Sequence, residues 1–471
     1  MKLSSLITPF MLPIAALTCM ALPATATDAS APEHHEAAYS KFKEALNTQA
    51  AANSPDPCPA ILIALNATGD EFCLDSWMQR AAKEGNAVAL NYIGTANLYY
   101  VPSNLKQSKQ VKDSVALVKK AADKKYAPAM VDYSTFMRSG VGTFENKAGA
   151  DRILLEACKS GNFETRFSWL LQTDRLMKYE DMNRPEVKGE IERGNHHVVY
   201  YLSGKAPDKF TALTMLTRAA RMGNHSAMYE LSTHLSTVNA VASYHYLKAA
   251  AAQHNPEALC TLGSYLISDN KKLAEELGVQ TDPEAGLHLL KIAGMLGNTV
   301  AQAKLAHIYF HGLCGMPKDA VKAYKHTQNG AMARPDVAFM TAQGYMLMSG
   351  SGVAKDVDKG YELIKLAAKQ RYPQAIAMQA YVNYRGIGIP SNGKEAAFLL
   401  ESLATQGFDI CFVYLALMYD EGSPTLPQDS AKVKYYMEHA RRGLGDRAQQ
   451  VFDYQKNNFN GWALSPFDIH I

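Results

Sequence analysis

Small and apolar residues recur along the chain with the spacing of amphipathic helices. In residues 297–312 (GNTVAQAKLAHIYFHG), a Gly-Asn pair is followed by a small residue, Ala301. An apolar residue comes four positions later, Leu305, and a second small residue, Ala306, follows it. This order places the small and apolar side chains on one helix face. Because Gly312 closes the segment, the pattern predicts a helix from the Gly-Asn pair to this glycine.

The same segment recurs along most of the sequence. Steps between the anchor residues, which are the positions equivalent to Ala301, run from about 29 to about 43 residues and average about 36, a period typical of solenoids. The anchors are Ala89, Ala129, Thr165, Val198, Ala227, Ala258, Ala301, Phe339, Ala375, Cys411 and Ala448. Repetition at this period predicts one elongated unit in which each repeat contacts its neighbours.

A second helix is predicted after each anchor helix, and it commonly opens on Asp or Pro, which suit a first helical turn. We call the anchor helix of a repeat helix A and the second one helix B. The predicted B helices cover residues 113–122, 147–158, 185–193, 208–221, 241–252, 283–295, 319–329, 356–369, 393–405 and 429–441. The fold class is therefore all-α, a right-handed α/α superhelical solenoid of about ten to eleven antiparallel helix pairs.

The Gly-Asn pairs have a physical explanation. Each helix B must end, and the chain must reverse, within a few residues before the next helix A. Glycine adopts the left-handed conformation past a helix end, and asparagine caps the start of the next helix. The pairs begin at Gly85, Gly161, Gly194, Gly223 and Gly297.

The N-terminus predicts an exported protein. Residues 1–26 have the basic start, apolar centre and Ala-Thr-Ala cleavage site of a signal peptide. Residues 27–57 are rich in Ala and Pro and form a tether or an N-terminal cap, residues 58–456 form the solenoid, and residues 457–471 form a tail. We expect a periplasmic or extracellular protein without a transmembrane segment in the mature chain.

The charge of the chain argues against one class of partner, and its cysteines raise the question of disulfide bonds. A net charge of +3 with 20% charged residues argues against a nucleic-acid-binding protein. An oxidising compartment permits disulfides, and Cys58 and Cys73 are close enough in sequence to form the best candidate pair. The other cysteines can pair or be buried as small apolar residues, and both alternatives stay open for Cys158, Cys260, Cys314 and Cys411.

The repeat resembles the Sel-1-like repeat (SLR) family, a branch of the tetratricopeptide-like α/α solenoids. The resemblance rests on the Gly-Asn junctions, the Ala-x-x-x-Leu-Gly helix and the glycine loops at Gly140, Gly350 and Gly386, and it covers approximately residues 73–456. It implies a scaffold whose A helices line a concave, peptide-receiving surface. Some secreted, cysteine-rich SLR proteins have been linked to penicillin binding or β-lactamase-like activity. Their closely spaced cysteine pairs are missing from this chain.

Short matches to serine-enzyme motifs give an alternative function. The Ser-x-x-Lys, Ser-Asp-Asn and Lys-x-Gly elements of such enzymes have counterparts at Ser40–Lys43, Ser103–Lys106, Ser268–Asn270 and Lys159–Gly161. However, the third element precedes the second and coincides with a helix junction. An envelope hydrolase acting on β-lactam or peptidoglycan substrates is therefore the alternative to a non-catalytic protein.

His307 and His311 share a helix face at the i, i+4 spacing that can chelate zinc. The His-Glu-x-x-His pattern is incomplete and no third ligand is identifiable, so these residues are weak candidates. The pairs His34-His35 and His196-His197 are weaker. We predict no metal and no cofactor.

The face of helix A opposite the packed stripe is the predicted partner-binding groove. Tyrosine and arginine are favoured at protein contacts because they supply large contact areas and hydrogen bonds. The groove candidates are Tyr92, Tyr99, Tyr201, Tyr345, Tyr381, Tyr414 and Arg385. The sequence thus predicts an exported, non-catalytic scaffold or adaptor that binds an envelope protein, or an extended polymer such as polysaccharide or peptidoglycan, along its concave face.

Overall fold

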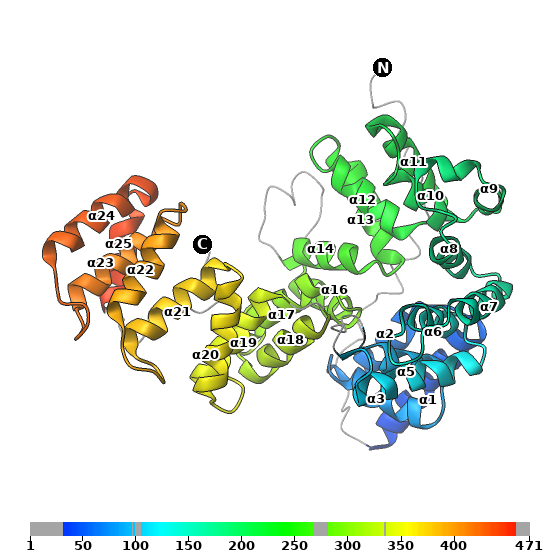
Figure 1. Cartoon of the computed structure of the whole chain (residues 1–471), viewed down its shortest axis with the longest axis horizontal. Helices are drawn as coiled ribbons and strands as arrows, with labels where there is room; N and C mark the ends of the chain where they lie inside the picture. The colour runs from blue at the N-terminus through cyan, green and yellow to red at the C-terminus, as the bar shows by residue number, and fades with distance from the viewer. Residues whose placement is uncertain (1–31, 97, 99–104, 268–280, 334–335, 458–471) are drawn as a thin grey trace. The chain divides into compact units, whose positions relative to one another are not determined.

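Each repeat of the chain is a pair of antiparallel helices joined by short turns (Figure 1). The computed structural model describes residues 32–96, 98, 105–267, 281–333 and 336–457. Over these residues the chain is helical apart from turns and one isolated bridge between Ser423 and Leu426. The predicted all-α solenoid is confirmed, and no helix within the described ranges is both long and apolar enough to cross a bilayer.

The chain divides into two compact units, residues 1–301 (unit 1) and 302–471 (unit 2). The helices before the boundary are α1 (Pro32–Ala51), α2 (Cys58–Thr68), α3 (Cys73–Lys83), α4 (Ala87–Ala96), α5 (Lys109–Asp123), α6 (Ala127–Ser139), α7 (Lys147–Ala157), α8 (Phe163–Gln172), α9 (Pro185–Glu192), α10 (His196–Ser203), α11 (Lys209–Arg221), α12 (His225–Leu235), α13 (Ala240–Ala252), α14 (Pro256–Ile267) and α16 (Pro283–Met295).

Unit 2 begins within α17 (Thr299–His311). The helices that follow are α18 (Ala320–Ala333), α19 (Val337–Ser349), α20 (Val357–Lys369), α21 (Pro373–Arg385), α22 (Gly393–Ala404), α23 (Ile410–Glu421), α24 (Ser430–Leu444) and α25 (Arg447–Asn457). The predicted B helices agree with these bounds to within a few residues; for example, predicted helix 113–122 is α5.

The expectation that each repeat contacts only its neighbours does not hold within unit 1. In unit 1, α16 packs against α2, about 200 residues earlier in the sequence, as Figure 1 also shows. Lys291 of this last helix forms an ion pair with the buried Glu71 (3.3 Å), and Met295 and Leu296 pack against the core that contains Trp77. The last repeat of unit 1 therefore contacts the first one.

Residues 32–51 form the first helix of the core rather than a tether. Tyr39, Phe42 and Leu46 of α1 are buried, and the rings of Tyr39 and Phe42 contact Trp77 edge-on at 5.8 and 5.2 Å between centroids. This helix covers the apolar side of the first repeat, which has no preceding repeat to pack against.

Glycine allows the two helices of some repeats to touch. A Cβ atom at Gly263 of α14 would lie 2.8 Å from the carbonyl oxygen of Gly286 in α16, and one at Gly286 would lie 2.7 Å from that of Gly263. Both clashes are with backbone atoms, which cannot move aside separately from their helices. The small residue five positions after the anchor is therefore required by the approach of helix B.

We expect Gly263→Ala to destabilise unit 1 by about 1–3 kcal/mol, because the added methyl group overpacks the α14–α16 contact. Gly189→Ala in α9 is the matched control, since its Cβ would meet only the flexible Arg193 side chain at 3.4 Å. The control should stabilise by about 0.5–1 kcal/mol through the higher helix propensity of alanine. Urea unfolding followed by tryptophan fluorescence measures the stability of both variants. In a Trp462→Phe background the signal reports on unit 1, because the remaining tryptophans, Trp77 and Trp169, lie there. Equal effects of the two substitutions would contradict the close-contact explanation.

Candidate functional site

The asparagines of the helix junctions bond in two directions. The Oδ1 atom of Asn224 accepts a hydrogen bond from the Ala227 amide (2.8 Å) and so caps α12, as the sequence predicts. Its Nδ2 atom donates to Nδ1 of His196, the first residue of helix A in the preceding repeat (3.1 Å). One side chain therefore caps its own helix and binds the neighbouring repeat.

Other junctions repeat this arrangement. Asn255 caps α14 and donates to Nδ1 of His225 (3.1 Å), and Asn195 caps α10 and donates to the Phe163 carbonyl (2.9 Å). The preceding glycines adopt the expected left-handed conformation, for example Gly223 with φ of 95°. The asparagine side chains thus form a ladder along the starts of the A helices.

The loop at residues 53–58, between α1 and α2, joins the two ends of this ladder. Asn53 accepts from the Ala127 amide through its side chain (2.8 Å) and from Asn162 Nδ2 through its carbonyl (3.1 Å). The Tyr126 hydroxyl donates to the Ser54 carbonyl (2.8 Å). The loop therefore supplies an acceptor to the first backbone amide of α6, which has no intrahelical acceptor, and another to the side chain of Asn162, which caps α8.

At the other end of the ladder, Nδ1 of His254 lies 3.0 Å from Oδ2 of Asp56 in the same loop. Consecutive links now form a closed circuit, which we call the junction ring. Its members are Asn53, Asp56, Asn162, Phe163, Asn195, His196, Asn224, His225, His254 and Asn255. The loop at 53–58 closes unit 1 on the side of the A-helix starts, and the Lys291–Glu71 pair closes it elsewhere.

Cys58 lies directly beside the closing contact. The Cys58 amide donates to Oδ1 of Asp56 (2.9 Å), which fixes the carboxylate against the start of α2. Burial tends to raise the pKa of Asp56, but the hydrogen bonds from His254 and from the Cys58 amide outweigh it, and this pKa lies below its usual range. Burial, together with the Asp56 charge, raises the pKa of the Cys58 thiol.

His196 and His225 accept the asparagine hydrogen bonds as neutral imidazoles. Because Asn224 Oδ1 already accepts from Ala227, its amide nitrogen faces His196, whose Nδ1 must be unprotonated to accept. Burial lowers the pKa of His196 and of His225. For His197, burial and then the neighbouring His196 and His225 rings lower the pKa to about 4.

Sequence reasoning missed the junction ring. Residues 53–57 contain two prolines, Pro55 and Pro57, and lie in the segment that the sequence predicts to be a tether or cap. His254 occupies the position that is glycine in the clearest repeats, so the Gly-Asn pair that marks a helix junction is absent there. The recurrence of histidine beside the junction asparagine, at His196, His225 and His254, was the available clue.

The groove candidates of unit 1 are partly buried. Tyr92 packs against the core of the first repeats, and its hydroxyl lies 3.5 Å from Asp75. Tyr201 of α10 contacts the Phe167 ring, with 5.7 Å between the centroids. Tyr99 lies outside the described residues.

In unit 2, the candidates Tyr345, Tyr381 and Arg385 lie on two successive A helices, α19 and α21. Phe310 of α17 meets Tyr345 of α19 edge-on at 6.2 Å. Tyr381 of α21 is half-buried, and the Arg385 guanidinium lies 6.0 Å from the centre of its ring. Arg385 also forms an ion pair with Glu421 of α23 (2.6 Å). We call Phe310, Tyr345 and Tyr381 the aromatic row.

The prediction that Tyr414 lies in an exposed groove is wrong. Its side chain is 5% exposed and belongs to the core of unit 2. The same core contains Ala448 and Phe452 of α25, the next A helix, which packs against α23.

His307 and His311 do share a helix face, and their ring centroids are 4.7 Å apart. In the part of the chain that the structure describes, however, they do not gather with a third His, Cys, Asp or Glu side chain. Among the residues described by the structure, the one such group of three is Asp56, Cys58 and His254.

Cys58 and Cys73 do not form the predicted disulfide. Cys58 is the first residue of α2, whereas the Cys73 thiol contacts the carbonyl of Ala64, six residues further along that helix. Six residues correspond to about 9 Å of helix, and a disulfide requires Cα atoms within about 7 Å. Cys158, Cys260, Cys314 and Cys411 also carry free thiols.

The serine-enzyme elements are not assembled over the described residues. Ser40 donates to the Glu36 carbonyl within its own helix (3.0 Å), and Lys43 forms an ion pair with Glu84. Lys159 pairs with Glu156 at the end of α7. Ser103 and residues 268–270 lie outside the described ranges.

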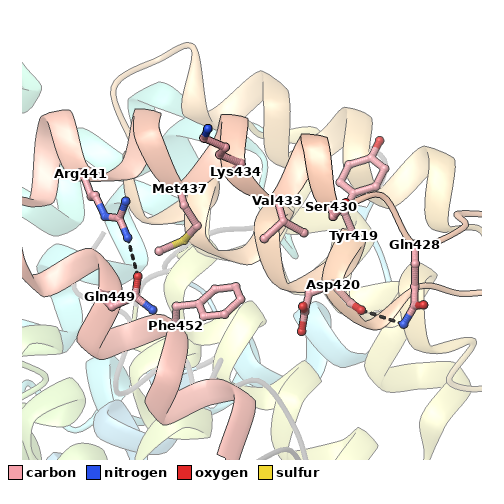
Figure 2. A pocket seen from close by; sticks show the side chains of 10 residues that line it. All are labelled: Tyr419, Asp420, Gln428, Ser430, Val433, Lys434, Met437, Arg441, Gln449 and Phe452. Atoms are coloured by element: carbon pink, nitrogen blue, oxygen red, sulfur yellow. Dashed lines mark hydrogen bonds between the residues drawn. The ribbon is translucent and has the colours of Figure 1, made fainter.

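A cavity of 490 Å³ opens beside α25, as Figure 2 shows. Val433, Met437 and Phe452 provide apolar lining. Of the charged lining groups, Arg441 donates to Gln449 (2.6 Å) and Asp420 forms an ion pair with Lys456 (2.8 Å). These charges hold α23, α24 and α25 together.

The helix pairs and their junctions define an α/α repeat protein. The Sel1 repeat matches residues 76–86, 194–224, 225–255, 272–298, 299–333, 335–372, 373–408 and 413–440. These segments make up about half of the chain, which therefore belongs to the Sel1 repeat family. Repeats of this kind typically present extended surfaces for protein interaction.

Two solved structures illustrate the similarity. One is a protective antigen present in uropathogenic Escherichia coli strains that displays an SLR fold, with 17% identity over 94% of this chain and 93% of that chain and a TM-score of 0.46. The other is a Sel1 repeat protein from Oxalobacter formigenes, with 21% identity over 54% of this chain and 99% of that chain and a TM-score of 0.41.

The neutral histidines should make unit 1 sensitive to acid. Between pH 6.5 and about 4, unfolded His197 binds a proton that folded His197 does not, so this residue lowers the free energy of unfolding as the pH falls. His197→Phe retains a ring against Phe167 and removes the titration. From pH 7 to pH 4.5, the variant should gain on the order of 2 kcal/mol relative to the wild type in urea unfolding. A difference independent of pH would show that folded His197 titrates normally.

Proposed function

We propose that this protein is an exported, non-catalytic scaffold that binds a protein partner through the aromatic row of unit 2 and the adjoining Arg385. The observation that carries the proposal is the row itself. Phe310 and Tyr345 are in contact on neighbouring A helices, and Tyr381 and Arg385 lie on the next A helix, α21, where Arg385 pairs with Glu421. A partner lying along these helices would touch several repeats.

The row has the chemistry of a protein-binding surface. Tyr345 and Tyr381 are packed on one side against the core and retain partly exposed rings, so little side-chain entropy is lost on binding. Arg385 is oriented by its ion pair with Glu421 and can donate further hydrogen bonds from its guanidinium. Aromatic side chains beside an arginine are the typical anchors of protein interfaces.

Unit 1 offers less free surface at the starts of its A helices. The loop at 53–58 already accepts hydrogen bonds from Ala127, Tyr126 and Asn162, so a partner would have to displace part of the chain itself. This favours unit 2 as the binding unit.

Residues 1–26 support export, and the partner proposed is accordingly a protein of the cell envelope. A polysaccharide or peptidoglycan strand is a second kind of extended ligand that aromatic rings can bind. The hydrolase alternative has less support, because Ser40 and Lys43 are engaged in separate contacts on α1.

Site-specific photo-crosslinking tests the proposal in living cells. Tyr345 or Tyr381 is replaced by p-benzoyl-phenylalanine, and the control position is Phe398, a 65% exposed residue on helix α22, a B helix of the same unit. We expect both row positions to give one common adduct with an envelope protein, and Phe398 to give none. Arg385→Ala should reduce the adduct several-fold.

Three outcomes would contradict parts of this proposal separately. Equal adducts at Phe398 would exclude the row as the binding surface. Absence of any protein adduct, together with retention on a peptidoglycan or polysaccharide matrix, would replace the protein partner by a polymer. A chain that stays in the cytoplasm with residues 1–26 attached would exclude export.

A further inference from the structure

Three different metal-ligating groups meet where the junction ring closes. The Cys58 sulfur, a carboxylate oxygen of Asp56 and a ring nitrogen of His254 all lie within 4.8 Å of one another. They come from segments almost 200 residues apart in the sequence, so the fold of unit 1, and not local sequence, brings them together. No other group of this kind occurs among the residues that the structure describes.

The arrangement is close to the dimensions of a tetrahedral zinc site. Metal bonds of about 2.0–2.3 Å to N, O and S ligands place neighbouring ligand atoms about 3.4–3.6 Å apart. Asp56 and His254 are 3.0 Å apart, and the sulfur lies within 4.8 Å of both. Movements of about 1 Å or less would therefore produce ideal geometry.

We propose that Asp56, Cys58 and His254 bind a divalent transition-metal ion of the zinc class, with water at the fourth position. A thiolate, a carboxylate and a neutral imidazole together balance the charge of a divalent ion. Cys58 is fully buried, whereas the side chains of Asp56 and His254 are 42% and 24% exposed, so the ion can enter, and water can remain, on their side.

The surroundings orient two of the ligands. The carboxylate of Asp56 is fixed by the Cys58 amide, which leaves its second oxygen directed at His254. Outer hydrogen bonds of this type hold metal ligands in place. His225 on the neighbouring junction faces the same carboxylate and contributes to its lowered pKa.

The backbone of His254 makes a clean substitution possible. This residue has φ of 60°, a left-handed conformation that the equivalent residues of the Gly-Asn junctions achieve with glycine, such as Gly223. A β-carbon is unfavourable there, so glycine can replace His254 without straining the backbone. Lys125 and Arg371 have the same conformation at other junctions, which makes them suitable controls.

Binding would fasten the loop at 53–58 to the start of α14. On binding, the neutral His254 ring carries its proton on Nε2 and presents Nδ1 to the ion, and Cys58 loses its thiol proton to solvent as the sulfur–metal bond forms. The product is a ring closed by coordinate bonds instead of one hydrogen bond. This role does not depend on the aromatic row of unit 2.

The test uses the full mature chain, freed of metal by a chelator and titrated with zinc in a calorimeter. We expect one ion per chain with a dissociation constant below 1 μM, and a rise in melting temperature. With cobalt in place of zinc, coordination by Cys58 should give a thiolate-to-cobalt charge-transfer absorption band.

His254→Gly is the decisive variant, because glycine suits the left-handed backbone while the ligand is lost. It should remain folded and bind zinc at least tenfold more weakly, and Cys58→Ser should abolish the cobalt band. Lys125→Gly relieves the same strain elsewhere and should leave affinity unchanged. No binding at micromolar zinc, or equal binding by wild type and His254→Gly, would overturn the proposal. Loss of binding only in a His307→Gln, His311→Gln double variant would move the site to α17.

Discussion

Unit 1 depends on the side-chain amide of the junction asparagine. In a simple solenoid, a residue at the start of each helix caps only that helix, and the contacts between repeats are apolar. Here each side chain of Asn224 and Asn255 does both. Its carbonyl oxygen caps its own helix, and its amide nitrogen donates a hydrogen bond to a histidine of the previous repeat. The glycine before Asn224 gives the turn that directs the side chain to both partners.

The loop at 53–58 converts this ladder into a ring. Asn53 and Asp56 connect repeats that would otherwise be separated by the whole length of unit 1. Buried links of this kind are strong when every partner is satisfied and costly when one is lost. The proposed metal site lies at the contact between Asp56 and His254, which joins the two ends of the ladder, so a bound ion would strengthen the closure of the ring. The aromatic row lies in unit 2, so the two proposals concern different parts of the molecule.

The fold could be predicted from the sequence because the residues that indicate each helix lie close together in the chain. The Gly-Asn caps, the small residues that allow close helix contact and the starts of the B helices each follow from a few neighbouring residues. The candidate sites depend on distant segments. Tyr414 was misplaced because its burial depends on a core that residues of several helices, from α21 to α25, build together. Asp56 was missed because its partner, His254, is far away in sequence and occupies a position where glycine is usual.

The central claim is that the junctions of unit 1 open together, as one ring, and native-state hydrogen exchange tests it most directly. Asn224→Ser keeps a side chain that caps α12 but is too short to reach His196. The account predicts that the variant lowers the protection of the Cys58, Ala127 and Ala258 amides, which lie in other repeats, by the same free energy as that of Ala227. A loss of protection confined to Ala227 and its neighbouring repeats would contradict the ring and leave an ordinary nearest-neighbour solenoid.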